Sequence, residues 1–242
     1  MIDVKIHLKK PGVKTPKGTC YVVAKNGAFI KREEWWARAI VPAKRIVGLD
    51  EEQTSFQLLL PPFPALELAK AHKFFRQTYI RFGSEACVLF YHTVDGYKIH
   101  VPQQCVDAGG VECDTSEVLP GDVCGSIHSH VGGVKAYHSI VDQQDEEYWD
   151  GVHITLGVIT TRQDFSLSVQ AVVNGHRFPV DMDWTQGLVP VKNGRFVIDC
   201  PEIENWVIPE EWTERVHPFP NDANFISFKE IKKPPKPRKE GP

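Results

Sequence analysis

The sequence lacks a long apolar run and carries little net charge. Its 242 residues include 28 Lys and Arg against 31 Asp and Glu, a formal net charge of −3. That balance argues against a protein that coats nucleic acid and gives no attraction to a membrane surface. No segment approaches the roughly 20 apolar residues of a membrane helix, and residues 1–10 have no apolar core of signal-peptide length. We expect a cytoplasmic protein that binds neither nucleic acid nor membrane.

Closely paired cysteines are also missing. The six cysteines form no CxxC pair, and their spacings do not suit a cysteine zinc cluster. Because no export signal is seen, the sequence predicts a reducing compartment and buried, reduced thiols. Cys87 and Cys124 lie in apolar stretches typical of strands.

The composition, 42% hydrophobic and 24% charged, is that of a globular protein. The PPFP segment at residues 61–64 interrupts the pattern and marks a boundary. We expect a β-rich N-terminal region of unknown role at residues 1–62 and the main domain at residues 63–216. Residues 217–242 are rich in Lys and Pro and are predicted to be a disordered tail.

Periodicity and turn residues predict an α+β fold. Leu68, Ala71, Phe75, Tyr79 and Phe82 recur at helical spacing and predict a helix over residues 65–82. Three dipeptides, Asn26-Gly27, Asp95-Gly96 and Asn174-Gly175, predict hairpins between apolar segments.

The other segments are assigned by the same signals. Residues 1–18 look irregular, residues 103–113 hold one further strand, and the pattern at 181–217 is weak. Residues 122–130 form a strand and residues 139–149 a short helix. The sum is a mixed β-sheet flanked by helices, with a small β-rich N-terminal region.

The candidate site begins with two histidines, His128 and His130, in the predicted strand DVCGSIHSH. Residues i and i+2 of a strand face the same side, so both imidazoles can reach one metal ion. Two imidazoles on a buried face are unfavourable unless something satisfies them. The alternative is a pair of hydrogen-bonded histidines without a metal.

A catalytic zinc ion needs a third ligand and an open position for water. Asp142 is the nearest well-placed carboxylate, in the first turn of the predicted helix, and Ser139 lies one turn before it. The alternative is that S-x-x-D is a capping box with Ser139 as N-cap. Glu85 opens the predicted strand EACVLFY and is either a base beside a metal-bound water or a solvated strand end.

Together, a glutamate after a helix, H-S-H at the end of a strand and S-x-x-D resemble the JAMM (MPN+) zinc metallopeptidases. The segments LPPFPALEL, EACVLFY, YKIHVPQQ, IHSH, AYHS and DGVHITLG are most similar to bacterial JAB proteins associated with ubiquitin-activating-like (E1-like) and ubiquitin-conjugating-like (E2-like) enzymes. The resemblance runs from about residue 60 to residue 177. It implies an MPN/JAB-like (cytidine-deaminase-like) mixed sheet and hydrolysis of the bond after the C-terminus of a ubiquitin-like modifier, free or conjugated.

The resemblance also implies roles for single residues. His128, His130 and Asp142 match the zinc ligands, Glu85 matches the general acid/base, and Ser139 matches the serine that stabilises the oxyanion. Two features depart from the family: Val131 replaces a common proline, and eight residues rather than seven separate His130 from Ser139. Because the extra residue can shift the register, Asp145 is the alternative third ligand.

Two other functions remain open. Two histidines and a carboxylate also bind the iron of non-haem oxygenases, and the metal content would separate that class. A metal-free MPN-type scaffold is the other alternative, although such a scaffold would have no reason to keep all five residues.

Overall fold

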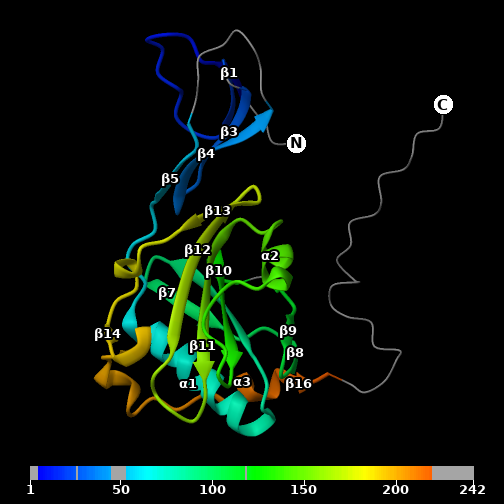
Figure 1. Ribbon diagram of the computed structural model, residues 1–242, viewed down its shortest axis with the longest axis vertical. Coiled ribbons are helices and arrows are strands. Elements are labelled where there is room, and N and C mark those ends of the chain that lie inside the picture. Colours follow the sequence, from blue (N-terminus) through cyan, green and yellow to red (C-terminus); the bar gives the residue numbers. More distant parts are fainter. Residues whose placement is uncertain (1–4, 26, 45–52, 118, 220–242) are drawn as a thin grey trace, which may run out of the picture. The chain divides into compact units, whose positions relative to one another are not determined.

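The computed structural model describes residues 5–25, 27–44, 53–117 and 119–219. Within these ranges the chain is an α+β protein with three α-helices and mostly mixed sheets (Figure 1). The predicted fold class is confirmed at this level. No helix in the described part of the chain is long and apolar enough to cross a membrane.

The chain forms two compact units. The first break, between Phe63 and Pro64, lies in the PPFP segment. The border also passes through two strands, β11 (Gly151–Ile159) and β12 (Ser166–Val173), which therefore contribute residues to both units. One unit comprises Met1–Phe63, His138–His153 and Val169–Gln186, and the other comprises Pro64–Tyr137, Ile154–Ser168 and Gly187–Pro242.

The N-terminal sheet has five strands in sequence order, and its small core contains Cys20, Val22, Ala24 and Phe29. Strands β2 and β3 pair antiparallel, as predicted for the hairpin at Asn26-Gly27. The prediction that residues 1–18 are irregular was partly wrong, because β1 pairs parallel to β2. The strands are β1 (Lys5–Leu8), β2 (Cys20–Ala24), β3 (Gly27–Glu33), β4 (Ala37–Lys44) and β5 (Ser55–Leu58).

Helix α1 spans Ala65–Phe82, the predicted range. It follows Pro64 and ends at Gly83, whose left-handed backbone (φ 65°) lets its N–H donate to Tyr79 O at 2.7 Å. Its buried face includes Leu68 and Phe75, and it contacts two strands of the main sheet, β7 (Gly96–His100) and β10 (Asp122–Val131). The helical pattern therefore describes a face that packs on the sheet.

The main sheet has six strands in the order β13-β12-β11-β10-β6-β7. Strand β10 pairs antiparallel with β6, and β11 is buried along its whole length, as its apolar sequence predicts. The hairpins predicted at Asp95-Gly96 and Asn174-Gly175 join β6 to β7 and β12 to β13. The bounds are β6 (Cys87–Thr93), β7 (Gly96–His100), β10 (Asp122–Val131) and β13 (His176–Pro179).

A three-stranded sheet, in the order β16-β8-β9, corrects two predictions. Residues 103–113 hold two strands, β8 (Gln104–Asp107) and β9 (Gly110–Cys113), because the chain turns tightly between them. The predicted tail begins too early, because β16 (Val216–Pro218) pairs parallel with β8. The tail from residue 220 lies outside the described residues.

Short elements occupy the region whose sequence pattern is weak. They are η1 (Met182–Trp184), β14 (Leu188–Pro190), η2 (Lys192–Gly194), β15 (Phe196–Ile198), η3 (Pro201–Ile203) and α3 (Glu210–Glu214). The predicted helix at residues 139–149 is shorter than expected, because α2 spans only Ile140–Glu146.

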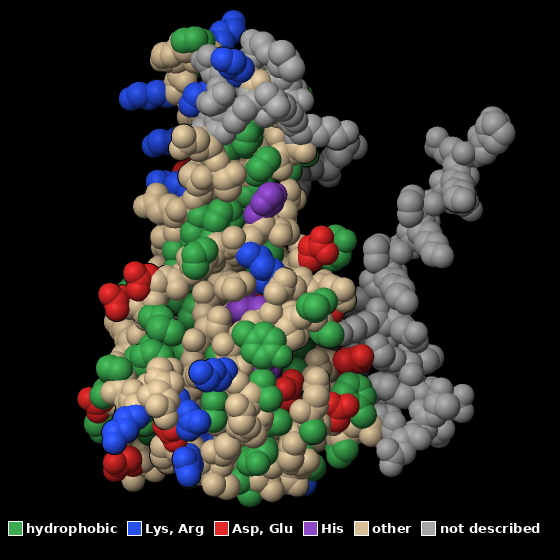
Figure 2. All heavy atoms as spheres, viewed as in Figure 1, with side chains coloured by type: hydrophobic (Ala, Val, Ile, Leu, Met, Phe, Trp, Pro, Cys, Tyr) green, Lys and Arg blue, Asp and Glu red, His purple; other side chains and the backbone are tan. Residues whose placement is uncertain are grey.

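Five of the six cysteines are buried, and none forms a disulfide in the described part of the chain. In the lower part of Figure 2, acidic and basic side chains are interspersed on the visible face, which agrees with the small net charge.

Candidate metal centre

The two histidines lie near the end of β10, on the same side of the strand. His128 and His130 are buried, with exposed fractions of 7% and 4%, and their ring centroids are 5.2 Å apart. Ser129, between them, faces the other side, and its Oγ accepts the backbone N–H of Ala86 at 2.9 Å. The strand therefore presents both imidazoles together, as predicted.

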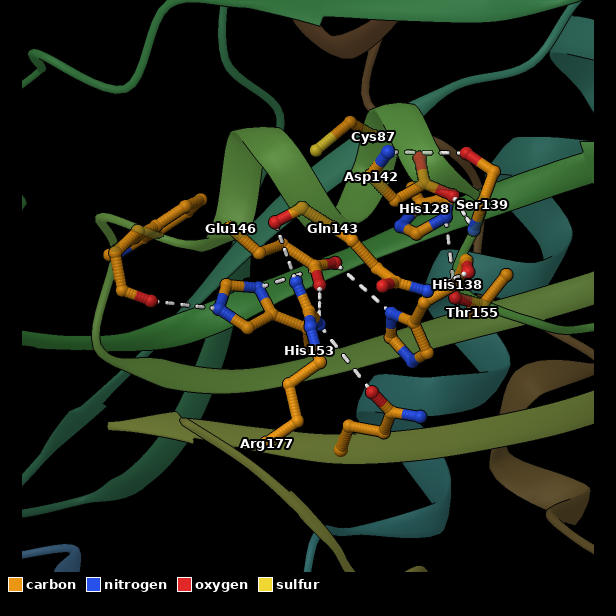
Figure 3. Close-up of polar contacts among 12 residues, drawn as sticks. Cys87, His128, His138, Ser139, Asp142, Gln143, Glu146, His153, Thr155 and Arg177 are labelled. Atoms are coloured by element: carbon orange, nitrogen blue, oxygen red, sulfur yellow. Dashed lines mark hydrogen bonds and ion pairs between the residues drawn. The ribbon is translucent and has the colours of Figure 1, made fainter. Parts of the chain in front are cut away.

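Neighbouring groups orient the two rings. His130 Nδ1 lies 3.4 Å from the carbonyl oxygen of Lys135. Since a carbonyl can only accept, this long contact favours the proton on Nδ1 and leaves the lone pair on Nε2 for a metal ion. The Tyr137 ring meets His130 edge-on at 5.0 Å. On the other ring, His128 Nε2 lies 3.2 Å from Thr155 Oγ1 of β11, so that hydroxyl sets the angle of the imidazole (Figure 3).

Asp142 and Ser139 form a capping box at the start of α2. Ser139 Oγ accepts the N–H of Asp142 at 3.1 Å, and Asp142 Oδ2 accepts the N–H of Ser139 at 2.7 Å. The capping alternative for S-x-x-D is thus confirmed. It does not exclude ligation, because the second bond also holds the carboxylate in one orientation.

One potential ligand atom from each of His128, His130 and Asp142 lies within 4.8 Å of the others. Two imidazoles and one carboxylate are a donor set found at catalytic zinc sites with three protein ligands, so the residues fit a zinc ion. Asp145, the alternative ligand, is exposed and belongs to no such cluster among the described residues. The extra residue before Ser139 therefore does not bring Asp145 into the cluster.

Glu85 lies just before the paired part of β6. Cys87, the first residue of β6, pairs with His128, and the Ser129 N–H donates to Ala86 O at 2.9 Å. Glu85 is half-buried, and its own backbone N–H donates to Asp107 O of β8 at 2.9 Å. The expectation that Glu85 opens the strand was wrong by two residues. If the antiparallel pairing continued over those two residues, Glu85 would face His130.

The loop between His130 and Ser139 is fastened to β11. The Gly132 N–H donates to Ile159 O at 2.9 Å, and the Val158 N–H donates to Val134 O at 2.5 Å. Gly132 has a left-handed φ of 65°, which a glycine adopts without strain. The loop therefore accommodates its extra residue by a fixed turn.

A buried ionic cluster fixes α2 to neighbouring strands. The sequence did not indicate this cluster. Glu146 Oε1 lies 3.1 Å from His138 Nδ1 and 3.9 Å from His153 Nδ1, and Glu146 Oε2 accepts from Arg177 Nη1 at 2.6 Å (Figure 3). Arg177 also donates to Gln143 O at 2.8 Å. Glu146 follows Asp142 by one helical turn, a spacing that could have indicated a shared helix face.

The charge of Glu146 is stabilised by these partners. Burial raises the pKa of its carboxyl, but the hydrogen bond from His138, the nearby His153 and the hydrogen bond from Arg177 outweigh burial and lower the pKa to about 2. Glu146 is therefore ionised at neutral pH, and the cluster joins α2 to β11 and β13 within one unit.

No family model and no curated protein matches the chain. The geometry and chemistry of the residues above are therefore the basis for its proposed function.

Proposed function

We propose that the chain is a zinc-dependent peptidase or isopeptidase with an MPN/JAB-like fold. It would cleave the bond that follows the C-terminus of a ubiquitin-like modifier, in a precursor or in a conjugate. The observation that carries this proposal is the group formed by His128, His130 and Asp142, whose ligand atoms lie within 4.8 Å of one another. Glu85, two residues before the strand that pairs with the histidine strand, would supply a base.

His128, His130 and Asp142 would hold the zinc ion. When bound, zinc supplies Lewis acidity and lowers the pKa of a water molecule toward ~7. Because the two histidines are buried, their contacts with Thr155 and Lys135 fix the ring orientations before the metal binds. This arrangement supports a metal site of fixed geometry.

Glu85 would move the proton. Its carboxylate takes a proton from the attacking water and later delivers that proton to the leaving amine nitrogen. Because Glu85 is outside the ligand group, its loss removes the base and leaves the metal ligands in place.

Ser139 would stabilise charge on the scissile carbonyl oxygen. Its Oγ accepts the Asp142 N–H, and a hydroxyl that accepts a hydrogen bond can still donate its own hydrogen. One well-placed donor to a developing oxyanion contributes roughly 3–4 kcal/mol to catalysis. The capping role and the catalytic role are therefore compatible.

The substrate would enter as an extended C-terminal tail that adds to a strand edge by β-augmentation. The resemblance to JAB proteins supports E1-like and E2-like enzymes as partners in the same pathway. Metal analysis of the purified protein, with His128→Ala as the control, tests the proposal at its first step. We expect about one zinc per chain in the wild type and a large loss in the variant. Bound iron with oxygen-dependent activity, or no metal at all, would contradict it.

A further inference from the structure

A cavity lies between α1 and the segment at residues 197–204. Its volume is about 520 Å³, within the range of small-molecule sites. Apolar walls come from Ala69, Val197 and Pro201. None of the residues assigned to the metal centre lines this cavity, so an inference about it is independent of the proposed function.

Two buried nitrogen atoms of the cavity lining have no hydrogen-bond partner among the described residues. They are Nε2 of His72 and Nε of Arg76, and the His72 residue is only 5% exposed. Residues four apart on a helix share a face, so both belong to the same side of α1. A buried polar group without a partner destabilises a protein by roughly 1–3 kcal/mol, which a bound acceptor would offset.

The side chains that carry these atoms are held in place. The His72 ring packs on Phe165 with centroids 4.8 Å apart, and Arg76 Nη2 donates to Thr161 O. Lys73, also in the lining, donates from Nζ to Ile203 O at 3.1 Å and to Trp206 O at 2.5 Å. An ammonium has three donors, so Lys73 has one more to offer.

The basic side chains of the lining favour an anion beside α1. Burial, reinforced by Arg76, lowers the pKa of His72 to about 3, so His72 is neutral at physiological pH, whereas Arg76 and Lys73 carry positive charge. The two acids of the lining, Asp199 and Glu204, are exposed, where solvent screens their charge.

We propose that this cavity binds a small molecule through one oxyanion group, a carboxylate or a phosphate, with an apolar body against the walls. The Arg76 guanidinium and the Lys73 ammonium supply positive charge for the oxyanion, and a small shift of the His72 and Arg76 side chains on α1 would let their buried nitrogens donate to it.

Titration calorimetry with three probes of one ring size tests the proposal on the full chain. Phenyl phosphate and benzoate carry the two oxyanions, and benzamide is the neutral control. We expect one or both anions to bind in the millimolar range or tighter, and benzamide to bind more weakly. A preference between the two anions would identify the group. Binding of benzamide as strong as that of both anions, or no binding by any probe, would overturn the proposal.

Variants locate the binding. Arg76→Gln should weaken the preferred anion by about tenfold, because a charged donor is lost, and His72→Phe should weaken it while keeping the contact with Phe165. Arg81→Gln is the matched control, since Arg81 is on the same helix, outside the cavity lining, and stacks on Phe82. Thermal melts show which variants fold. If His72→Phe does not fold, Arg76→Gln alone tests the site. Equal weakening by Arg76→Gln and Arg81→Gln, or no effect of Arg76→Gln, would exclude this site.

Discussion

Gly157 of β11 lies directly against the backbone of Ala136. A Cβ atom at position 157 would fall 2.0 Å from Ala136 N and 2.3 Å from the Lys135 carbonyl carbon. Lys135 also provides the carbonyl that orients His130. The close approach of strand and loop therefore determines how the second histidine is held.

Gly157→Ala should move this loop. The extra methyl group cannot be accommodated without a backbone shift, so we expect the free energy of unfolding to fall by about 1–3 kcal/mol, with weaker zinc binding. Gly133→Ala is the matched control, because a Cβ there would meet nothing within 4 Å. Chemical denaturation and zinc titration check both variants, and equal effects of the two would exclude this role for Gly157.

Zinc affinity distinguishes Asp142, the proposed third ligand, from Asp145, its neighbour on α2. Asp142→Asn keeps an oxygen that can cap Ser139 but loses the carboxylate charge. We expect it to lower zinc affinity by more than the roughly 10–100-fold seen when an outer-shell partner is lost. Asp145→Ala, on the same helix and exposed, should bind zinc like the wild type. Competition with a chromogenic chelator measures both affinities, and the reverse ranking would make Asp145 the ligand.

Glu146 makes the free energy of unfolding depend on pH in the acid range. Its pKa is lowered from 4.5 to about 2, so the folded state binds this proton less readily than the unfolded state. The stabilisation is complete above pH 4.5 and is lost as the pH falls toward 2. Glu146→Gln lacks this ionisation. The difference in unfolding free energy between wild type and variant, both in chelator, should shrink as the pH falls from about 5 toward 2. A difference independent of pH would show that Glu146 is not held ionised.

Local sequence signals were sufficient for the main elements. Leu68 and Phe75 recur at helical spacing, and Pro64 and Gly83 enclose the helix, so α1 was predicted with its bounds. Strand β1 was not predicted, because its pairing with β2 is a tertiary contact that its own residues do not encode. The same holds for β16, which pairs with β8.

The candidate site was likewise predicted only in part. His128, His130 and Asp142 were selected from spacing and resemblance, and the structure brings their ligand atoms together; their binding of zinc stays a prediction. The partners of Glu146 were missed because Arg177 is 31 residues away in the sequence. The contact between Gly157 and Ala136 was missed for a related reason, since nothing in either segment indicates that they touch.

Glu85 is proposed as the base of a zinc peptidase and not as a ligand. Glu85→Gln keeps the size and hydrogen bonding of the side chain but cannot accept the proton. Zinc content and the rate of cleavage of a ubiquitin-like fusion protein are measured for this variant. We expect zinc content and thermal stability near those of the wild type, with cleavage slower by roughly 10²–10⁴. Undiminished cleavage would place the base elsewhere, and loss of zinc together with activity would make Glu85 a ligand.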